Sequence, residues 1–156
     1  MNRGARFRYP LEPILLTRRW ELDGLLAELA EHNAALAAQA GRVGQLQGEL
    51  DAAAAEFKSV AASQDGLPVQ RFLILSRYVG DVAQRLRGEQ LELERLAGLR
   101  DAMAERAMAG RRALEAVEKH RDEMKDKFVQ QRLSGDFKVA DDQWSTLQAG
   151  MTSDAS

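Results

Sequence analysis

A ladder of apolar residues, one at every seventh position, constrains this sequence more than any other feature. The first ladder consists of Leu15, Leu22, Leu29, Leu36, Val43, Leu50 and Phe57. The positions three residues after each of these are apolar less regularly. Apolar residues repeating in this way keep one face of a helix toward a partner helix, as in a coiled coil. The pattern therefore predicts a long helix, over residues 10–63, whose apolar face packs against a second helix.

A second ladder follows a clear interruption. Residues 62–68 contain Gly66 and Pro68, and glycine and proline are the strongest breakers of regular structure. The second ladder then runs through Phe72, Val79, Leu86, Leu93, Arg100, Ala107, Leu114, Arg121 and Phe128. We predict a turn at 64–67 and a second helix over 68–134. Because so short a connection makes two helices antiparallel, the predicted fold is all-α, an antiparallel coiled-coil hairpin.

The two ends of the chain carry no ladder. Residues 1–9 are expected to form a flexible N-terminal segment. Ser134 and Gly135 are predicted to end the second helix, because glycine favours a helix terminus. Residues 135–156 are rich in Ser, Asp and Thr, with Phe137 and Trp144 as isolated aromatics. This composition predicts a mostly disordered tail.

The charges beside the ladders favour one register. A turn centred on Gly66 would place Phe57 beside Leu75. Opposite charges would then face one another in the pairs Glu49–Arg85, Arg42–Glu92 and Glu28–Arg106. Sliding by one heptad would instead oppose like charges, so we predict this register.

Composition excludes several classes of protein. The 22 Lys and Arg nearly balance the 24 Asp and Glu, and the two signs alternate along the chain, so we expect no nucleic-acid binding. The absence of Cys rules out disulfides and thiolate metal sites and is typical of a reducing cytosol. No run approaches the ~20 apolar residues of a membrane span, and the apolar run near the start is too short for a signal peptide.

Nothing in the sequence indicates catalysis. It contains no phosphate-binding Gly-x-x-x-x-Gly-Lys loop. Its two histidines, His32 and His120, lack the Glu three residues earlier that a helical di-metal site uses; Leu29 and Val117 stand there instead. We therefore expect His32 to be a tolerated polar residue in the interface and His120 to be solvated. We expect no enzymatic activity, no cofactor and no metal.

The residues with the strongest indication of function lie near the open end of the predicted hairpin. Basic residues gather there in both helices: Arg3, Arg6, Arg8, Arg18, Arg19, Arg111, Arg112, Lys119, Arg121, Lys125 and Lys127. Arg18 and Arg19 oppose the dipole of the first helix, and Arg19 would face Arg111. Such conflicts are often functional, although a solvated basic end is the simpler alternative. Trp20 points away from the partner helix and could anchor a bound protein, unless residues 7–13 fold back and cover it.

The start of the chain resembles a known family. Phe7-Arg8-Tyr9-Pro10-Leu11-Glu12-Pro13-Ile14-Leu15-Leu16-Thr17-Arg18-Arg19 is similar to the opening of FliJ-like proteins, which include flagellar FliJ and the injectisome protein YscO. The similarity in architecture covers residues 5–133. The pair Pro10 and Pro13, with the long tail, looks closer to the injectisome branch.

The resemblance implies a cytoplasmic stalk at the cytoplasmic face of a type III secretion apparatus, with a fold like the central coiled coil of the rotary ATPase gamma subunit. Such a stalk inserts into the pore of a hexameric export ATPase and links it to the export gate in the membrane; some members also carry export chaperones. It reaches the membrane only through its partners and is a monomer alone. By analogy, Arg6, Arg8, Arg18, Arg19, Arg111 and Arg112 would contact the ATPase. Leu67, Arg71 and Tyr78, at the turn, would face the gate.

Two other interpretations remain open at the level of sequence. The chain could be a cytoplasmic coiled-coil adaptor or chaperone-binding protein outside secretion. It could also form a homodimeric or tetrameric structural bundle. Stimulation of an export ATPase would distinguish a stalk from an adaptor outside secretion. The mass in solution would distinguish a homodimeric or tetrameric bundle from a monomeric hairpin.

Overall fold

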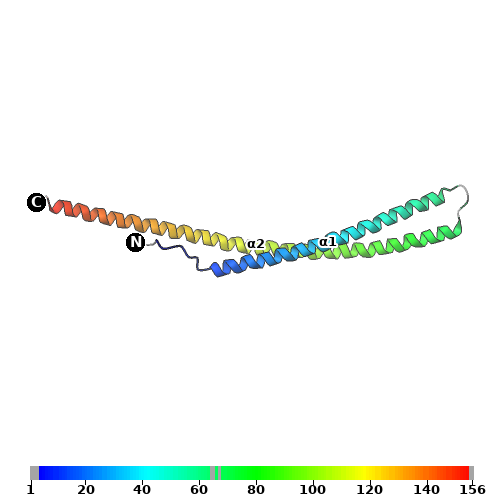
Figure 1. Cartoon of the computed structure of the whole chain (residues 1–156), viewed down its shortest axis with the longest axis horizontal. Helices are drawn as coiled ribbons and strands as arrows, with labels where there is room; N and C mark the ends of the chain where they lie inside the picture. Colours follow the sequence, from blue (N-terminus) through cyan, green and yellow to red (C-terminus); the bar gives the residue numbers. More distant parts are fainter. Residues whose placement is uncertain (1–3, 64–65, 67, 155–156) are drawn as a thin grey trace. The chain divides into compact units, whose positions relative to one another are not determined.

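The computed structural model describes residues 4–63, 66 and 68–154. They form two long helices, α1 (Glu12–Ala61) and α2 (Val69–Ser153), and contain no strand (Figure 1). The predictions of an all-helical chain and of two long helices are confirmed.

Local sequence explains where α1 begins and ends. The carbonyl of Tyr9 accepts a hydrogen bond from the amide of Glu12 at 3.2 Å, and Glu12 places a negative charge in the first turn, where it suits the helix dipole. After α1, Gly66 has a φ of 83°, a left-handed conformation that glycine adopts without steric cost. The remainder of the predicted turn, Gln64, Asp65 and Leu67, lies outside the described residues.

Residues 23–109 form one compact unit, in which α1 and α2 lie side by side (Figure 1). Near the end of α1 the ring of Phe57 lies 5.0 Å from that of Phe72, and further back Gln39 donates to the backbone carbonyl of Glu89 at 3.0 Å. Late residues of α1 thus contact early residues of α2, which is the order of contacts in a helical hairpin. The core of this unit consists of Ala53, Leu75, Val82, Leu86, Met103 and Ala107, with Gln39 among them.

The register differs from the predicted one. Phe57 contacts Phe72 and was expected beside Leu75. Glu92, expected opposite Arg42, instead pairs with Arg95 of its own helix at 2.6 Å, and none of the three predicted charge pairs forms among the described residues. Exposed ion pairs contribute only ~0.5 kcal/mol each, so the packing of the buried residues decides the register.

Residues 1–22 and 110–156 form the second compact unit. Leu15 is completely buried, and Tyr9 and Leu22 are almost completely buried. Leu15 and Leu22 belong to the first ladder, so the ladder continues to supply the core here. Tyr9 precedes α1 and was not predicted to contribute.

Helix α2 does not stop where the sequence predicted. It was expected to end at residue 134 and to be followed by a disordered tail over 135–156, but it continues through Ser153. The predicted end is wrong because Ser134 and Gly135 are weak signals without a proline. One glycine inside a helix costs only about 1 kcal/mol relative to alanine. The structure thus adds a long segment of helix to this unit.

Candidate protein-binding surface

The N-terminal segment is attached to α2 by aromatic residues. A hydrogen bond of 2.6 Å joins the hydroxyl of Tyr9 to Nδ1 of His120, and the same hydroxyl lies 3.5 Å from the carbonyl oxygen of Val117. The ring of Phe7 lies 5.6 Å from that of Phe128. We call these four side chains, Phe7, Tyr9, His120 and Phe128, the N-terminal clasp. Tilted aromatic pairs at such distances add stabilisation beyond their buried area.

An ion pair supports the clasp. Glu12, at the start of α1, lies 3.8 Å from Nε of Arg121. A shallow hollow lined by Phe7, Arg8, Tyr9, Glu12 and Arg121 lies between the N-terminal segment and α2. Residues 1–9 were predicted to be a flexible segment; residues 1–3 lie outside the described residues, but Phe7 and Tyr9 pack on α2.

Sequence reasoning missed the clasp because it treated His120 as a solvated residue. His120 is exposed, but its ring nitrogen has a specific hydrogen-bond partner in Tyr9. The available signal was the alternation of Phe7 and Tyr9, two aromatics on the same side of an extended segment just before a helix. Such residues need an apolar surface to cover, and the C-terminal half of α2 provides it.

The predicted basic cluster is less concentrated than expected. Arg18 pairs with Glu21 at 3.2 Å. Arg19, expected to face Arg111, pairs with Glu118 at 3.5 Å, so the expected repulsion does not arise. Glutamates thus neutralise two of the arginines locally.

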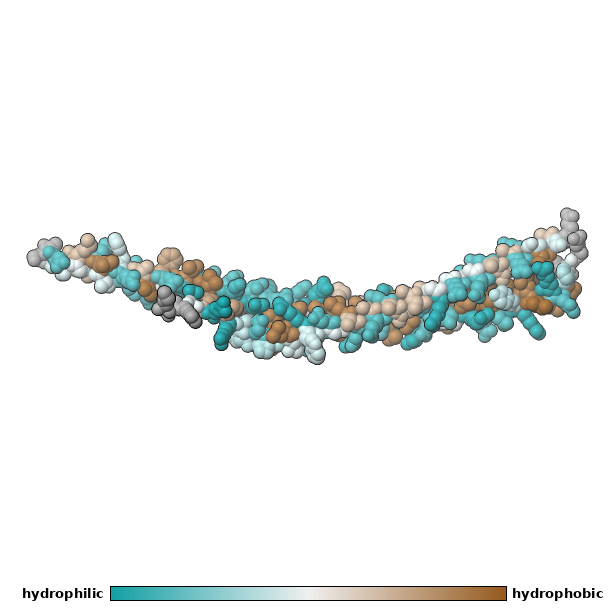
Figure 2. Space-filling view, viewed as in Figure 1, coloured by the Kyte–Doolittle hydropathy of each residue, from teal (hydrophilic) through white to brown (hydrophobic). Residues whose placement is uncertain are grey.

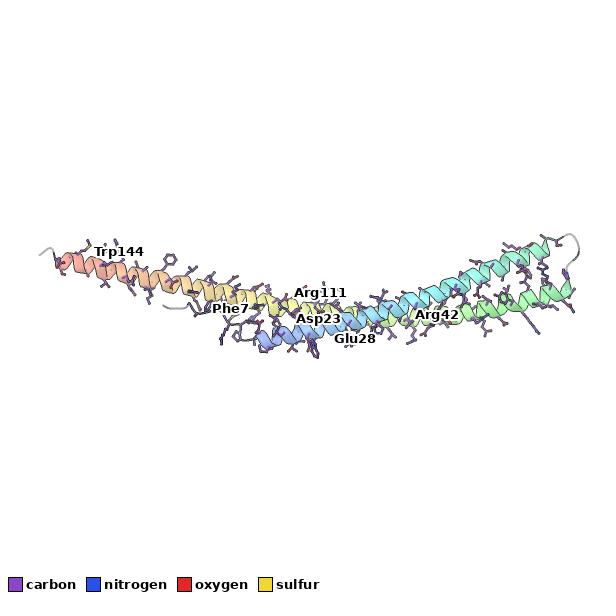
Figure 3. The ribbon with its side chains drawn as sticks, viewed as in Figure 1. Phe7, Asp23, Glu28, Arg42, Arg111 and Trp144 are labelled. Carbon is purple, nitrogen blue, oxygen red and sulfur yellow. The ribbon has the colours of Figure 1, made fainter. Side chains whose placement is uncertain are left out.

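The other arginines of this cluster are divided between the N-terminal segment and α2. Within the described part of the chain, Arg6, Arg8, Arg111 and Arg112 are exposed and form no ion pair. Arg8 is adjacent to Tyr9, which contacts His120. Arg111 lies nine residues before His120, or ~13 Å away along α2. Since α2 also continues far beyond Phe128, these residues do not form the tip that the sequence predicted (Figure 3).

Trp20 is the most exposed tryptophan of the chain, at 78%. Leu16, one turn earlier on the same face, is 55% exposed. The N-terminal segment was considered as a cover for Trp20, but it packs against α2 through the clasp instead. Leu16 and Trp20 therefore form an apolar pair open to solvent, beside the Arg19–Glu118 ion pair.

At the other predicted contact region, two of the three residues are described. Arg71 pairs with Glu56 at 3.2 Å, and Tyr78 is 43% exposed. Leu67 lies outside the described residues. The apolar side chains of Val69, Leu73 and Ile74, which sequence reasoning did not select, are also exposed near the start of α2.

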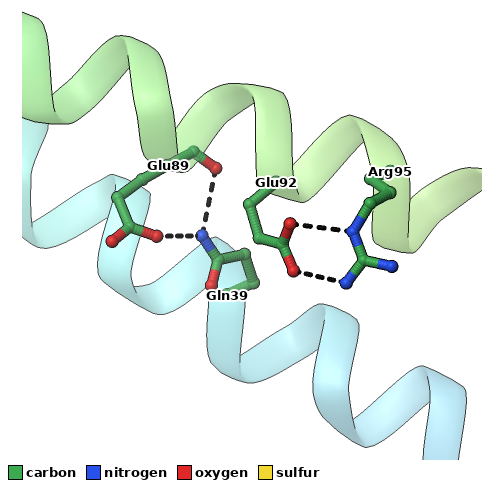
Figure 4. Close-up of polar contacts among 4 residues, drawn as sticks. All are labelled: Gln39, Glu89, Glu92 and Arg95. Carbon is green, nitrogen blue, oxygen red and sulfur yellow. Dashed lines mark hydrogen bonds and ion pairs between the residues drawn. The ribbon is translucent and has the colours of Figure 1, made fainter.

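A polar contact interrupts the apolar core of residues 23–109. The amide nitrogen of Gln39, which is almost fully buried, donates to both the backbone carbonyl and the carboxylate of Glu89 (Figure 4). One turn on, Arg95 donates two hydrogen bonds to Glu92, at 2.8 and 2.6 Å. These hydrogen bonds hold the pKa of Glu92 below its usual value and raise the pKa of Arg95. The Gln39–Glu89 contact joins the two helices, whereas Glu92 and Arg95 share one helix.

The described residues contain no cluster of His, Asp and Glu that could hold a metal ion. Neither α1 nor α2, over the part described, contains a stretch apolar and long enough to cross a membrane. This surface exposes Trp and Arg, two residue types that are enriched where binding energy concentrates in protein interfaces. Comparisons of the chain with models of protein families, with curated proteins and with solved structures find no match.

Proposed function

We propose that this chain is a non-enzymatic stalk of a type III secretion export apparatus, which binds a hexameric export ATPase and links it to the export gate. The proposal includes an antiparallel coiled-coil pairing of α1 with α2, similar to the gamma subunit of rotary ATPases. It places the protein at the cytoplasmic face of the apparatus, where export chaperones are further candidate partners.

The observation that carries the proposal is that residues of the segment resembling the opening of the FliJ and YscO family pack against α2. Within that opening segment, Phe7 contacts Phe128 and Tyr9 bonds to His120. Leu15, further along the segment, is completely buried. The distinctive residues of this segment thus attach the N-terminal segment to α2. This attachment supports a shared architecture with that family.

A surface for the ATPase is available in the same unit. Leu16 and Trp20 expose apolar side chains, and Arg6, Arg8, Arg111 and Arg112 expose cations without an ion pair among the described residues. Trp and Arg are the residue types most enriched where binding energy concentrates in protein interfaces. We propose Trp20 as the apolar anchor of this contact.

The test is ATP hydrolysis by a purified hexameric type III export ATPase with and without this chain. We expect the unaltered chain to bind the hexamer and to increase its rate. Replacing Trp20 with alanine, or Arg111 and Arg112 with glutamate, should reduce binding with unchanged helicity, because all three side chains are exposed. The matched control replaces Arg85 and Arg87, exposed arginines of the other unit, with glutamate and should leave binding intact.

If the unaltered chain neither binds nor stimulates the hexamer, the stalk proposal fails, and an adaptor outside secretion becomes the better explanation. If the chain stimulates the ATPase and all variants behave alike, the stalk stands but Trp20 and the two arginines are not its contact.

A further inference from the structure

The last turns of α2 expose a row of apolar side chains. Figure 2 shows hydrophobic residues on the surface of this end of α2, and Trp144 projects from it in Figure 3. We call this row the C-terminal stripe. It consists of Leu133, Phe137, Ala140, Trp144, Leu147 and Met151.

The spacing of the stripe is that of a coiled-coil seam. Its residues alternate steps of four and three, and at ~100° per residue they fall within about 80° of the helix circumference. The side chains are well exposed: Trp144 by 61% and Leu147 by 64%. The stripe covers about 27 Å of helix, the length of a pairing site for another helix of similar extent.

The stripe does not continue the face that α2 turns toward α1. In the same unit, that face passes through Val117, Met124 and Phe128, which are half-buried. Extending the same seven-residue pattern beyond Phe128 would lead to Gln131, Gly135 and Lys138, which are not apolar. The stripe is instead rotated by about 160° from that face. It is therefore a separate surface, for a different partner than α1.

From residue 133 onward, α2 is not covered by the other residues that the structure describes. Every residue from 131 to 154 is exposed, and its side-chain hydrogen bonds are local, such as that from Thr146 to the carbonyl of Asp142 at 2.8 Å. The segment also contains Gly135 and Gly150, which weaken a helix. An unsupported helix of such composition is marginal in water, because packing of an apolar face supplies most helix stability in proteins. A partner on the stripe would supply that packing.

The charges beside the stripe identify the chemistry of that partner. Asp136 borders one edge and Asp141 the other, whereas Lys138 lies on the opposite side of the helix. Arg132, near the start of the stripe, turns its guanidinium toward Gly4 of the N-terminal segment. Both edges are thus acidic, and a partner helix would meet them with residues flanking its own apolar seam.

A second copy of the chain fits these charges poorly. In a parallel pair, Asp136 of one copy would face Asp141 of the other. In the antiparallel arrangement that aligns all six apolar residues, Asp141 would face its own counterpart. Like charges in these positions repel, so an acidic edge favours a partner of opposite sign.

We propose that the C-terminal stripe is a docking site for an amphipathic helix of another protein whose apolar seam is flanked by Lys or Arg. This inference does not depend on the proposed function, because it rests on a surface distant from Trp20 along the sequence and on a different face of α2 from the α1 contact.

The experiment uses the full chain with Trp20→Phe, so that Trp144 is its only tryptophan. Two synthetic peptides of about three heptads serve as probes, both with Leu at the seam positions and one with Lys, the other with Glu, at the flanking positions. The flanking charges also keep each peptide from pairing with itself. Binding is measured by Trp144 emission and by calorimetry.

We expect the Lys peptide to bind more tightly than the Glu peptide by on the order of tenfold, since two edge contacts change from attraction to repulsion. Replacing Asp136 and Asp141 with lysine should reverse the preference. Leu147→Asp should abolish binding of both peptides. The matched control, Val139→Asp, adds the same charge at a similarly exposed residue off the stripe and should retain binding.

Three results would overturn the proposal. The first is equal binding of the two peptides, and the second is binding that survives Leu147→Asp. The third is a dimer of the unaltered chain, seen by analytical ultracentrifugation, that Leu147→Asp abolishes; this would assign the stripe to a second copy.

Discussion

Replacing Gln39 and Glu89 with leucine, singly and together, measures how much the buried polar contact contributes to the pairing of α1 and α2. Gln39 is almost fully buried, and its amide donates to both the backbone and the side chain of Glu89. A polar group within an apolar seam is expected to specify the register at a cost in stability.

The magnitudes follow from the contacts. A hydrogen bond to a charged group contributes about 1.5–3 kcal/mol, so the double-mutant cycle should give a coupling free energy near 2 kcal/mol. Gln39→Leu alone leaves the half-buried carboxylate of Glu89 beside an apolar side chain and should cost about 1 kcal/mol. The double leucine variant should be about as stable as the unaltered chain, because replacing both hydrogen-bond partners by apolar groups of similar shape is nearly neutral.

Urea unfolding followed by circular dichroism at fixed protein concentration gives the four free energies of unfolding. The same cycle on Glu92 and Arg95, an exposed pair within one helix, serves as control and should give a much smaller coupling free energy. A coupling free energy for Gln39 and Glu89 no larger than that of the control would refute the reasoning. A double leucine variant less stable than either single variant would do the same.

Three further predictions concern single groups. Tyr9→Phe removes the hydroxyl that bonds to His120 and should cost about 1 kcal/mol locally, seen as faster hydrogen exchange in the first turn of α1; unchanged exchange would show that the hydroxyl does not hold the segment. Leu15→Ala empties a completely buried position and should cost about 3 kcal/mol, lowering the melting temperature by roughly 6–12 °C; a loss below about 1 kcal/mol would contradict the burial. Hydrogen bonds from Arg95 lower the pKa of Glu92, so Glu92→Gln should be slightly less stable than the unaltered chain above the ordinary pKa of 4.5. This difference in the free energy of unfolding should vanish as the pH falls through the lowered pKa, and a difference that grows in acid would contradict the prediction.

The helices were predictable from the sequence because their signal is repeated many times. The first ladder is apolar at all seven of its positions and the second at seven of nine, and Gly66 with Pro68 marks the break. Several weak preferences that agree outweigh any one of them. The same redundancy explains why Leu15 and Leu22 could be assigned to the core in advance.

The register and the end of α2 were not predictable for the opposite reason. The register depends on which side chains fit together, such as Phe57 with Phe72, and three exposed charge pairs are too weak to reveal it. The end of α2 was placed at Gly135 on a single signal, although the spacing of Phe137, Trp144 and Met151 already follows a helix.

The candidate site was predictable only in part. Exposure of Trp20 follows from its place on the outer face of α1, and the structure agrees. Two contacts were not predictable, the ion pair of Arg19 with Glu118 and the hydrogen bond of Tyr9 with His120. They depend on how the non-helical N-terminal segment and long side chains pack on α2. No periodic pattern encodes such contacts.

The central claim is that α1 and α2 pair within one molecule, and a crosslinking experiment tests it most directly. The chain contains no Cys, so cysteines introduced at Gln39 and Glu89 would be the only thiols. A short thiol-specific crosslinker should join them efficiently within one chain, with the mass of a monomer. Cysteines at Gln39 and Leu93, the register expected from the charges, should react far less. Crosslinked dimers, or preferential reaction of the second pair, would contradict the account.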